Sequence, residues 1–114
     1  MAPLDFDTTL SSGGDALIAL SGELDLLGAP ALDEEIGRLA ERADVRRVVL
    51  DLRGLSFLDS SGLRVVALAA RRLLAAGREL TLVRGSETVQ RVFEITRMAE
   101  RLNFVDTPPE VAGA

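Results

Sequence analysis

Two serines and a glycine, Ser60-Ser61-Gly62, follow Asp59 shortly after a strongly apolar run at 48–52. The apolar run has the composition of a buried strand, and the residues after Gly62 have the composition of a long helix. The first turn of a helix carries unpaired backbone N–H groups and about half a positive charge, so it suits a bound or covalently attached phosphate. The serines therefore indicate either a phosphorylation switch or only a helix cap.

Missing residue types exclude most kinds of active site. Histidine is absent, which removes the Ser-His-Asp arrangement and the usual general base near neutral pH. All 13 basic residues are arginines, so no lysine can form a Schiff base, a Ser-Lys pair or a phosphate-binding loop. Cysteine is absent, which excludes disulfides and thiolate metal sites. A conventional enzyme is not expected, and the serines are expected to be a substrate rather than nucleophiles.

Charge and hydropathy exclude further classes of function. The net charge of −5 and the lack of Tyr and Trp argue against a nucleic-acid partner. No stretch of about 18 uncharged apolar residues is present, and the N-terminus shows no signal-peptide pattern. We therefore expect a cytoplasmic protein without direct membrane insertion and with no cofactor or metal of its own.

The elements that must position the serines follow from the apolar periodicity. Alternation at 4–10 and a second apolar segment at 16–21, joined by a Ser/Gly turn, predict a β-hairpin. Pro30 occupies a favoured first helical position. The helix it begins is expected to bury one face and to be weakened by Gly37 by about 1 kcal/mol relative to Ala. The residues expected on that buried face are Leu32, Ile36, Leu39 and Ala43.

The rest of the chain alternates strand and helix, which predicts right-handed crossovers between parallel strands. The predicted elements are a central strand at 47–52, a helix at 61–76 stopped by Gly77, a strand at 79–84, a helix capped by Ser86 and a short strand at 103–106. We predict a single α/β domain with a mixed four- to five-stranded sheet and helices mainly on one face. Its core spans about 4–106, and 107–114 is expected to be a frayed tail.

The chain resembles a STAS domain, and specifically a bacterial anti-sigma factor antagonist. Two stretches carry the resemblance: Gly-Glu-Leu-Asp and Ala-Pro-Ala-Leu within 22–32, and the apolar run leading to Asp-Ser-Ser-Gly-Leu within 48–63. The resemblance implies that the unphosphorylated chain binds an anti-sigma factor, which is also its serine kinase, and so releases a sigma factor. Phosphorylation of the serine before the glycine, here Ser61, would abolish that binding. A serine phosphatase would restore it, and the ATP and magnesium would belong to the kinase.

The predicted site follows from this resemblance. Ser61 is the predicted phosphorylation site, whereas Ser60 is the less favoured acceptor and the favoured cap. Asp25 is predicted with equal weight to be a turn former or part of the partner surface, and Gly62 is expected to leave the backbone open to a kinase. Helix residues beside Arg64 and Arg71 are expected to form an exposed contact patch. The predicted partner-binding residues are Asp25, Asp59, Ser60, Ser61, Gly62, Leu63 and Arg64.

The sequence differs from the family pattern at three places, and it leaves two other functions open. Gly28-Ala29 replaces a Thr-Ala pair, which removes a hydroxyl cap. Thr96-Arg97-Met98 replaces Thr-Gly-Leu, so the helix there is expected to run on toward Leu102. The residues after Asp106 are poor material for a closing helix.

The alternative functions are a non-enzymatic adaptor subunit of a lipid-transport complex and weak nucleotide binding through backbone N–H groups of the serine loop.

Overall fold

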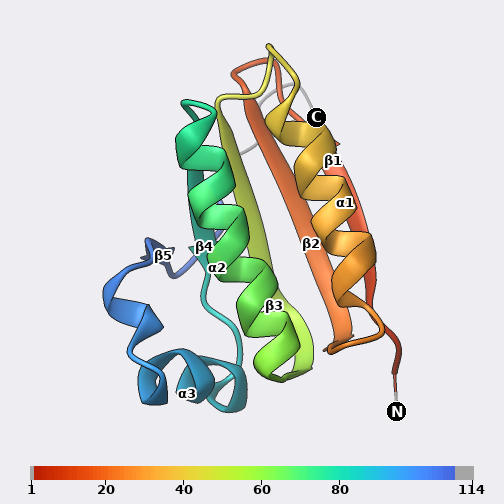
Figure 1. Cartoon of the computed structure of the whole chain (residues 1–114), viewed down its shortest axis with the longest axis vertical. Helices are drawn as coiled ribbons and strands as arrows, with labels where there is room; N and C mark the ends of the chain where they lie inside the picture. The colour runs from red at the N-terminus through yellow and green to blue at the C-terminus, as the bar shows by residue number, and fades with distance from the viewer. Residues whose placement is uncertain (1, 110–114) are drawn as a thin grey trace.

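The computed structural model describes residues 2–109 and contains a five-stranded mixed sheet, which confirms the predicted α/β class (Figure 1). The first two strands form an antiparallel hairpin, and each later strand is parallel to its neighbour. The strand order follows the chain: β1 (Asp5–Leu10), β2 (Asp15–Leu24), β3 (Arg47–Leu58), β4 (Glu79–Val83) and β5 (Phe104–Val105).

Two long helices cover one face of the sheet, as predicted. α1 (Ala29–Ala40) and α2 (Ser60–Ala75) lie side by side on that face, while α3 (Glu87–Ile95) lies near the end of the sheet where β3 passes into α2 (Figure 1). Apolar residues of the helices and of the facing strand positions form a continuous buried core. None of the described helices combines the length and the apolar character needed to cross a membrane.

β3 is longer than its sequence suggests. Its first half is buried, with no exposed surface at Val48, Val49 and Leu50. The strand then continues through the polar stretch 53–56, past the end at Leu52 that the sequence predicts, because β2 keeps pairing with it as far as Leu58. The pairing shifts register on the way, and Gly54 permits the irregularity because a Cβ there would lie 2.4 Å from the Leu20 carbonyl oxygen.

α1 is shorter than predicted. It ends at Ala40, and Ala43 is exposed, so the prediction that Ala43 belongs to the buried face is wrong. Gly37 is buried, and a Cβ there would lie 2.6 Å from Nη2 of Arg72 in α2. The glycine therefore leaves room for the guanidinium between the helices, where it also faces Asp33 at 3.6 Å.

The other face of the sheet has no described helix over it and carries paired charges instead. Asp15 and Arg47 form an ion pair at 2.8 Å between neighbouring strands. Asp51 is mostly buried on this face and accepts hydrogen bonds from the side chain and the amide of Arg53. Burial raises the pKa of the Asp51 carboxyl, but these bonds and the Arg53 charge together lower it below its ordinary value.

The prediction that the last helix runs toward Leu102 is wrong. α3 ends at Ile95, and a short 3-10 turn follows at Met98–Glu100. Arg97 makes this break by adopting the left-handed conformation, with φ of 63°, that a glycine would take more readily. The predicted tail at 107–114 lies largely outside the described residues, which end at Pro109.

The left-handed Arg97 gives a stability prediction. Arg97→Gly removes the Cβ strain at this position and should stabilise the fold by about 0.5–1 kcal/mol, the strain relief outweighing the greater freedom of glycine in the unfolded chain. Arg97→Ala is the control: it also removes the exposed ion pair with Glu100, but it keeps the Cβ. Urea unfolding compares the two variants, and an Arg97→Gly variant no more stable than Arg97→Ala would contradict the account.

Candidate functional site

Two strand-to-helix turns meet at the carboxyl ends of β2 and β3. Leu24 and Leu58 are paired at the end of the two strands, and the Asp59 amide donates to the Leu24 carbonyl at 3.3 Å. Asp25 directly follows Leu24 in the sequence, and Asp59 directly follows Leu58. The pairing therefore brings together the two stretches, 22–32 and 48–63, that carry the family resemblance.

Asp59, and not a serine, caps α2. Its Oδ1 accepts a hydrogen bond of 3.0 Å from the Gly62 amide, and its carbonyl accepts one of 2.9 Å from Leu63. The helix begins at Ser60, one residue earlier than predicted, and the prediction that Ser60 is the cap is wrong. Ser60 is exposed and Ser61 is partly buried, and neither hydroxyl is needed to begin the helix.

Gly62 allows α2 to approach the strands closely. The residue is buried, and a Cβ there would lie 2.5 Å from the Leu24 carbonyl oxygen and 2.6 Å from Cδ1 of Leu58. The expectation that Gly62 leaves its backbone open to a kinase is therefore wrong. Its contribution to the site is the tight junction that fixes where the two serines project.

Asp25 shapes the neighbouring turn. Its Oδ1 accepts hydrogen bonds of 3.1 Å from the amides of Leu27 and Gly28, and its carbonyl accepts one of 2.9 Å from Ala29. The turn-forming role is thus present in the structure, and the side chain remains partly exposed beside the serine loop. Gly28 is the N-cap of α1 without a side-chain hydrogen bond, as its replacement of a hydroxyl residue predicts.

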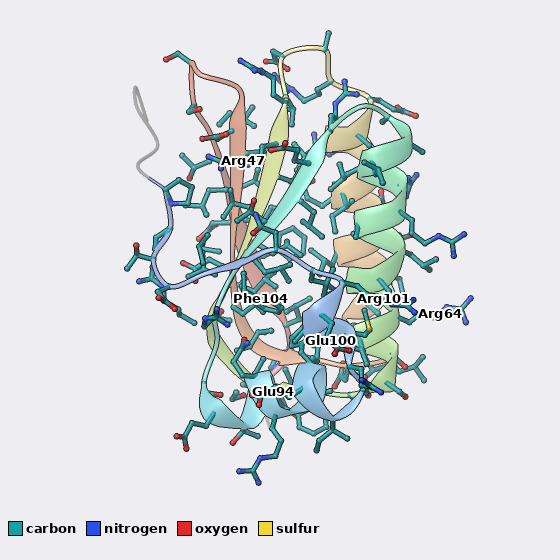
Figure 2. All side chains as sticks on the ribbon, turned by 90° about the vertical axis from the view of Figure 1, so that its left-hand side faces the viewer. Arg47, Arg64, Glu94, Glu100, Arg101 and Phe104 are labelled. Carbon is teal, nitrogen blue, oxygen red and sulfur yellow. The ribbon has the colours of Figure 1, made fainter. Side chains whose placement is uncertain are left out.

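The remaining predicted residues lie on the first turns of α2. Leu63 is half-buried against the core, whereas Arg64 is exposed and points away from the helix into solvent (Figure 2). Further along the helix, Val66 and Leu73 are buried and Leu68 is 41% exposed. An exposed face of α2 therefore exists where Arg64 and Leu68 follow each other one turn apart.

Three exposed apolar side chains near the serine loop were not predicted. Leu26 and Leu27, here called the leucine pair, are 71% and 88% exposed in the turn after Asp25. Phe57 is 42% exposed and pairs with Glu23 one position before Leu58. The sequence did contain a signal for this exposure. The two leucines are adjacent and lie between a strand and the Gly-Ala-Pro sequence that begins a helix, and side chains in such a turn have no core to pack into.

The site is a surface and not an enclosed pocket for chemistry. No cluster of acidic residues able to hold a metal ion occurs among the described residues. The cavity on this side has a volume of about 280 Å³ and is lined by Leu27, Gly28 and Ala31 among others. Exposed leucines beside two aspartates and two serines suit contact with another protein.

The tight junction at Gly62 gives a second stability prediction. Gly62→Ala should destabilise the fold by about 1–3 kcal/mol, because the new methyl group meets a backbone carbonyl that cannot move aside. Ser60→Ala, two residues earlier and exposed, is the matched control and should change stability by less than about 0.5 kcal/mol. Urea unfolding measures both, and equal stabilities would show that α2 does not depend on this contact.

Comparison with known proteins agrees with this architecture. The STAS domain family model matches residues 8–111. The anti-sigma-B factor antagonist of Bacillus subtilis is 34% identical over 91 residues, which cover 79% of this chain and 81% of that protein. The anti-sigma-F factor antagonist RsfB of Mycobacterium tuberculosis is 32% identical over 81 residues, which cover 71% of this chain and 66% of that protein.

Solved structures of similar proteins have the same fold. The anti-sigma factor antagonist SpoIIAA in its unphosphorylated form superimposes with a TM-score of 0.76 at 26% identity, with 89% of this chain and 88% of that chain covered. The Bacillus cell fate determinant SpoIIAA in its phosphorylated form gives a TM-score of 0.70 at 25% identity, with 89% and 91% covered. The chain belongs to the STAS domain family, and its named relatives in that family are anti-sigma factor antagonists.

Proposed function

We propose that this chain is a phosphorylation-controlled anti-sigma factor antagonist. The unphosphorylated form binds an anti-sigma factor that is also its serine kinase, and the sigma factor is released. The observation that carries the proposal is that Asp59 caps α2. The Ser61 hydroxyl is therefore not needed to begin the helix. It lies at the turn to which the resemblance assigns the modification. The chain itself is proposed to have no catalytic activity.

The chemistry of the switch belongs to the partner. The kinase transfers the γ-phosphoryl group of ATP to Oγ of Ser61, the bond from that phosphorus to ADP breaks, and the hydroxyl proton is released. A serine phosphatase reverses the state by hydrolysis. ATP and magnesium bind to the kinase and not to this chain, and the reaction is placed in the cytoplasm, where ATP is available.

A phosphate on Ser61 should be tolerated by the free fold. The helix N-terminus favours an anion by about 0.3–1 kcal/mol, and the nearby Asp59 carboxylate opposes it by a comparable amount. Within a dry protein interface the balance differs, because a dianion whose charge is not fully compensated costs several kcal/mol to desolvate. The modification is therefore expected to change partner affinity far more than stability, and a phosphorylated form of the relative SpoIIAA has been solved with this fold.

The partner surface is proposed to combine the serine loop with the leucine pair. The turns that carry them are joined by the bond between the Asp59 amide and the Leu24 carbonyl, so they form one continuous edge. A few side chains that become fully buried near the centre of an interface supply most of the binding energy, and a strongly exposed apolar side chain is a candidate for such a position. Leu27 is the most exposed of the large apolar residues described and is the expected anchor.

The phosphorylation site is tested with Ser61 variants. Ser61→Ala should bind a candidate anti-sigma factor kinase with or without ATP, and Ser61→Asp should bind at least tenfold more weakly because it places a carboxylate in the interface. Calorimetric titration measures the affinities, and mass spectrometry after incubation with kinase and ATP locates the phosphate. Ser60→Ala is the control and should still be phosphorylated. Equal binding by the two Ser61 variants, or a phosphate at another residue, would refute the switch.

The anchor is tested separately. Leu27→Ser should weaken binding of the unphosphorylated chain about tenfold or more, because it removes an exposed apolar side chain from the proposed interface. Leu74→Ser is the matched control, since Leu74 is 75% exposed near the other end of α2. Both variants should retain the stability of the parent chain. A larger loss of affinity from the Leu74 variant would place the interface elsewhere.

A further inference from the structure

All the charged side chains of α2 are positive. The helix contains three arginines and no acidic residue, in a chain with a net charge of −5. Arg72 faces Asp33 of α1. Arg64 and Arg71 form no ion pair with any residue in the described part of the chain. They are uncompensated cations on an otherwise acidic protein.

Arg64 is also the arginine nearest in sequence to the serine loop. It lies three residues after Ser61 and four after Ser60, the spacings at which helical side chains are neighbours on one face. Its side chain is exposed and points into solvent (Figure 2). The nearest carboxylate before it on the chain, that of Asp59, is engaged with the Gly62 amide. A phosphate on Ser61 would therefore meet Arg64 before any other described cation of the helix.

We propose that Arg64 is the counter-cation of a phosphate on Ser61, so that modification forms an ion pair along α2 instead of leaving the dianion unpaired. The guanidinium fork suits two phosphate oxygens, and an exposed arginine changes rotamer readily. The importance of this pairing for regulation rests on the proposed function, whereas the pairing itself does not require a partner.

With this pairing, phosphorylation of Ser61 changes the charge of the surface in two ways. Without phosphate, the first turns of α2 offer a partner the free cation Arg64. With phosphate, the serine and Arg64 together carry a charge of about −1, from a dianion and one cation, and the guanidinium is held along the helix. A partner that contacts Arg64 through an acidic group loses that cation and meets an anion in its place.

The test uses the chain alone, produced with phosphoserine at position 61 by genetic incorporation. The second ionisation of the phosphate is followed by ³¹P NMR during a pH titration. Because the ion pair favours the dianion, Arg64→Gln should raise the second pKa of the phosphate by about 0.3 unit, from the usual strength of a helical ion pair. Arg64→Lys should restore part of the shift, and far-UV circular dichroism should be unchanged in both variants.

Arg71→Gln is the matched control, because it removes the same charge about two turns further along α2. It should move the second pKa by less than about 0.1 unit, since screening weakens an exposed charge at that distance. The carboxylates of Asp25 and Asp59 raise this pKa in every variant alike and leave the comparison intact. Equal titrations of the Arg64→Gln and Arg71→Gln chains would overturn the proposal. Failure of a kinase to modify Ser61 would refute the proposed function and leave this result standing.

Discussion

The junction between the end of β2 and the start of α2 is the constraint on which the site depends. Leu24 pairs with Leu58, its carbonyl accepts the Asp59 amide, and the same carbonyl lies so close to Gly62 that no Cβ fits between them. This contact fixes both the direction in which α2 leaves the sheet and its distance from the turn at Asp25. The serines occupy a defined position because a neighbouring strand, remote in sequence, presses against the residue that follows them.

Much of the fold could be predicted from local patterns. Alternating and continuous apolar segments located all five strands, and Gly77 stops the helix before it in the left-handed conformation that its position predicts. The errors arise where tertiary contacts override local preference. β3 continues through polar residues because β2 keeps pairing with it, and Arg97 takes a conformation usually given to glycine because the chain must turn back to form β5.

The sequence predicted which loop forms the candidate site, but it did not predict the role of each residue in that loop. Three consecutive residues, Asp59 to Ser61, are all good cap formers, and only the hydrogen bond to the Gly62 amide distinguishes among them. The exposure of Leu27 depends on where the turn after Asp25 ends, and that point is set by two hydrogen bonds to a single carboxylate oxygen. The buried state of Gly62 depends on a contact with β2 that no local pattern contains.

The ionisable side chains of the two turns, Asp25, Asp59 and Arg64, are carboxylates and a guanidinium, and the chain contains no histidine. Histidine is the side chain whose unperturbed pKa places its change of charge between about pH 5 and 8, so the chain lacks the most common pH-sensing residue. The surface of this edge therefore has no histidine through which a change in acidity could alter its charge. A covalent phosphate, with a second pKa near about 6, would add a side-chain group that exchanges a proton in this range. Under the proposed function, the covalent state of Ser61, and not the proton concentration, is the variable that this surface reports.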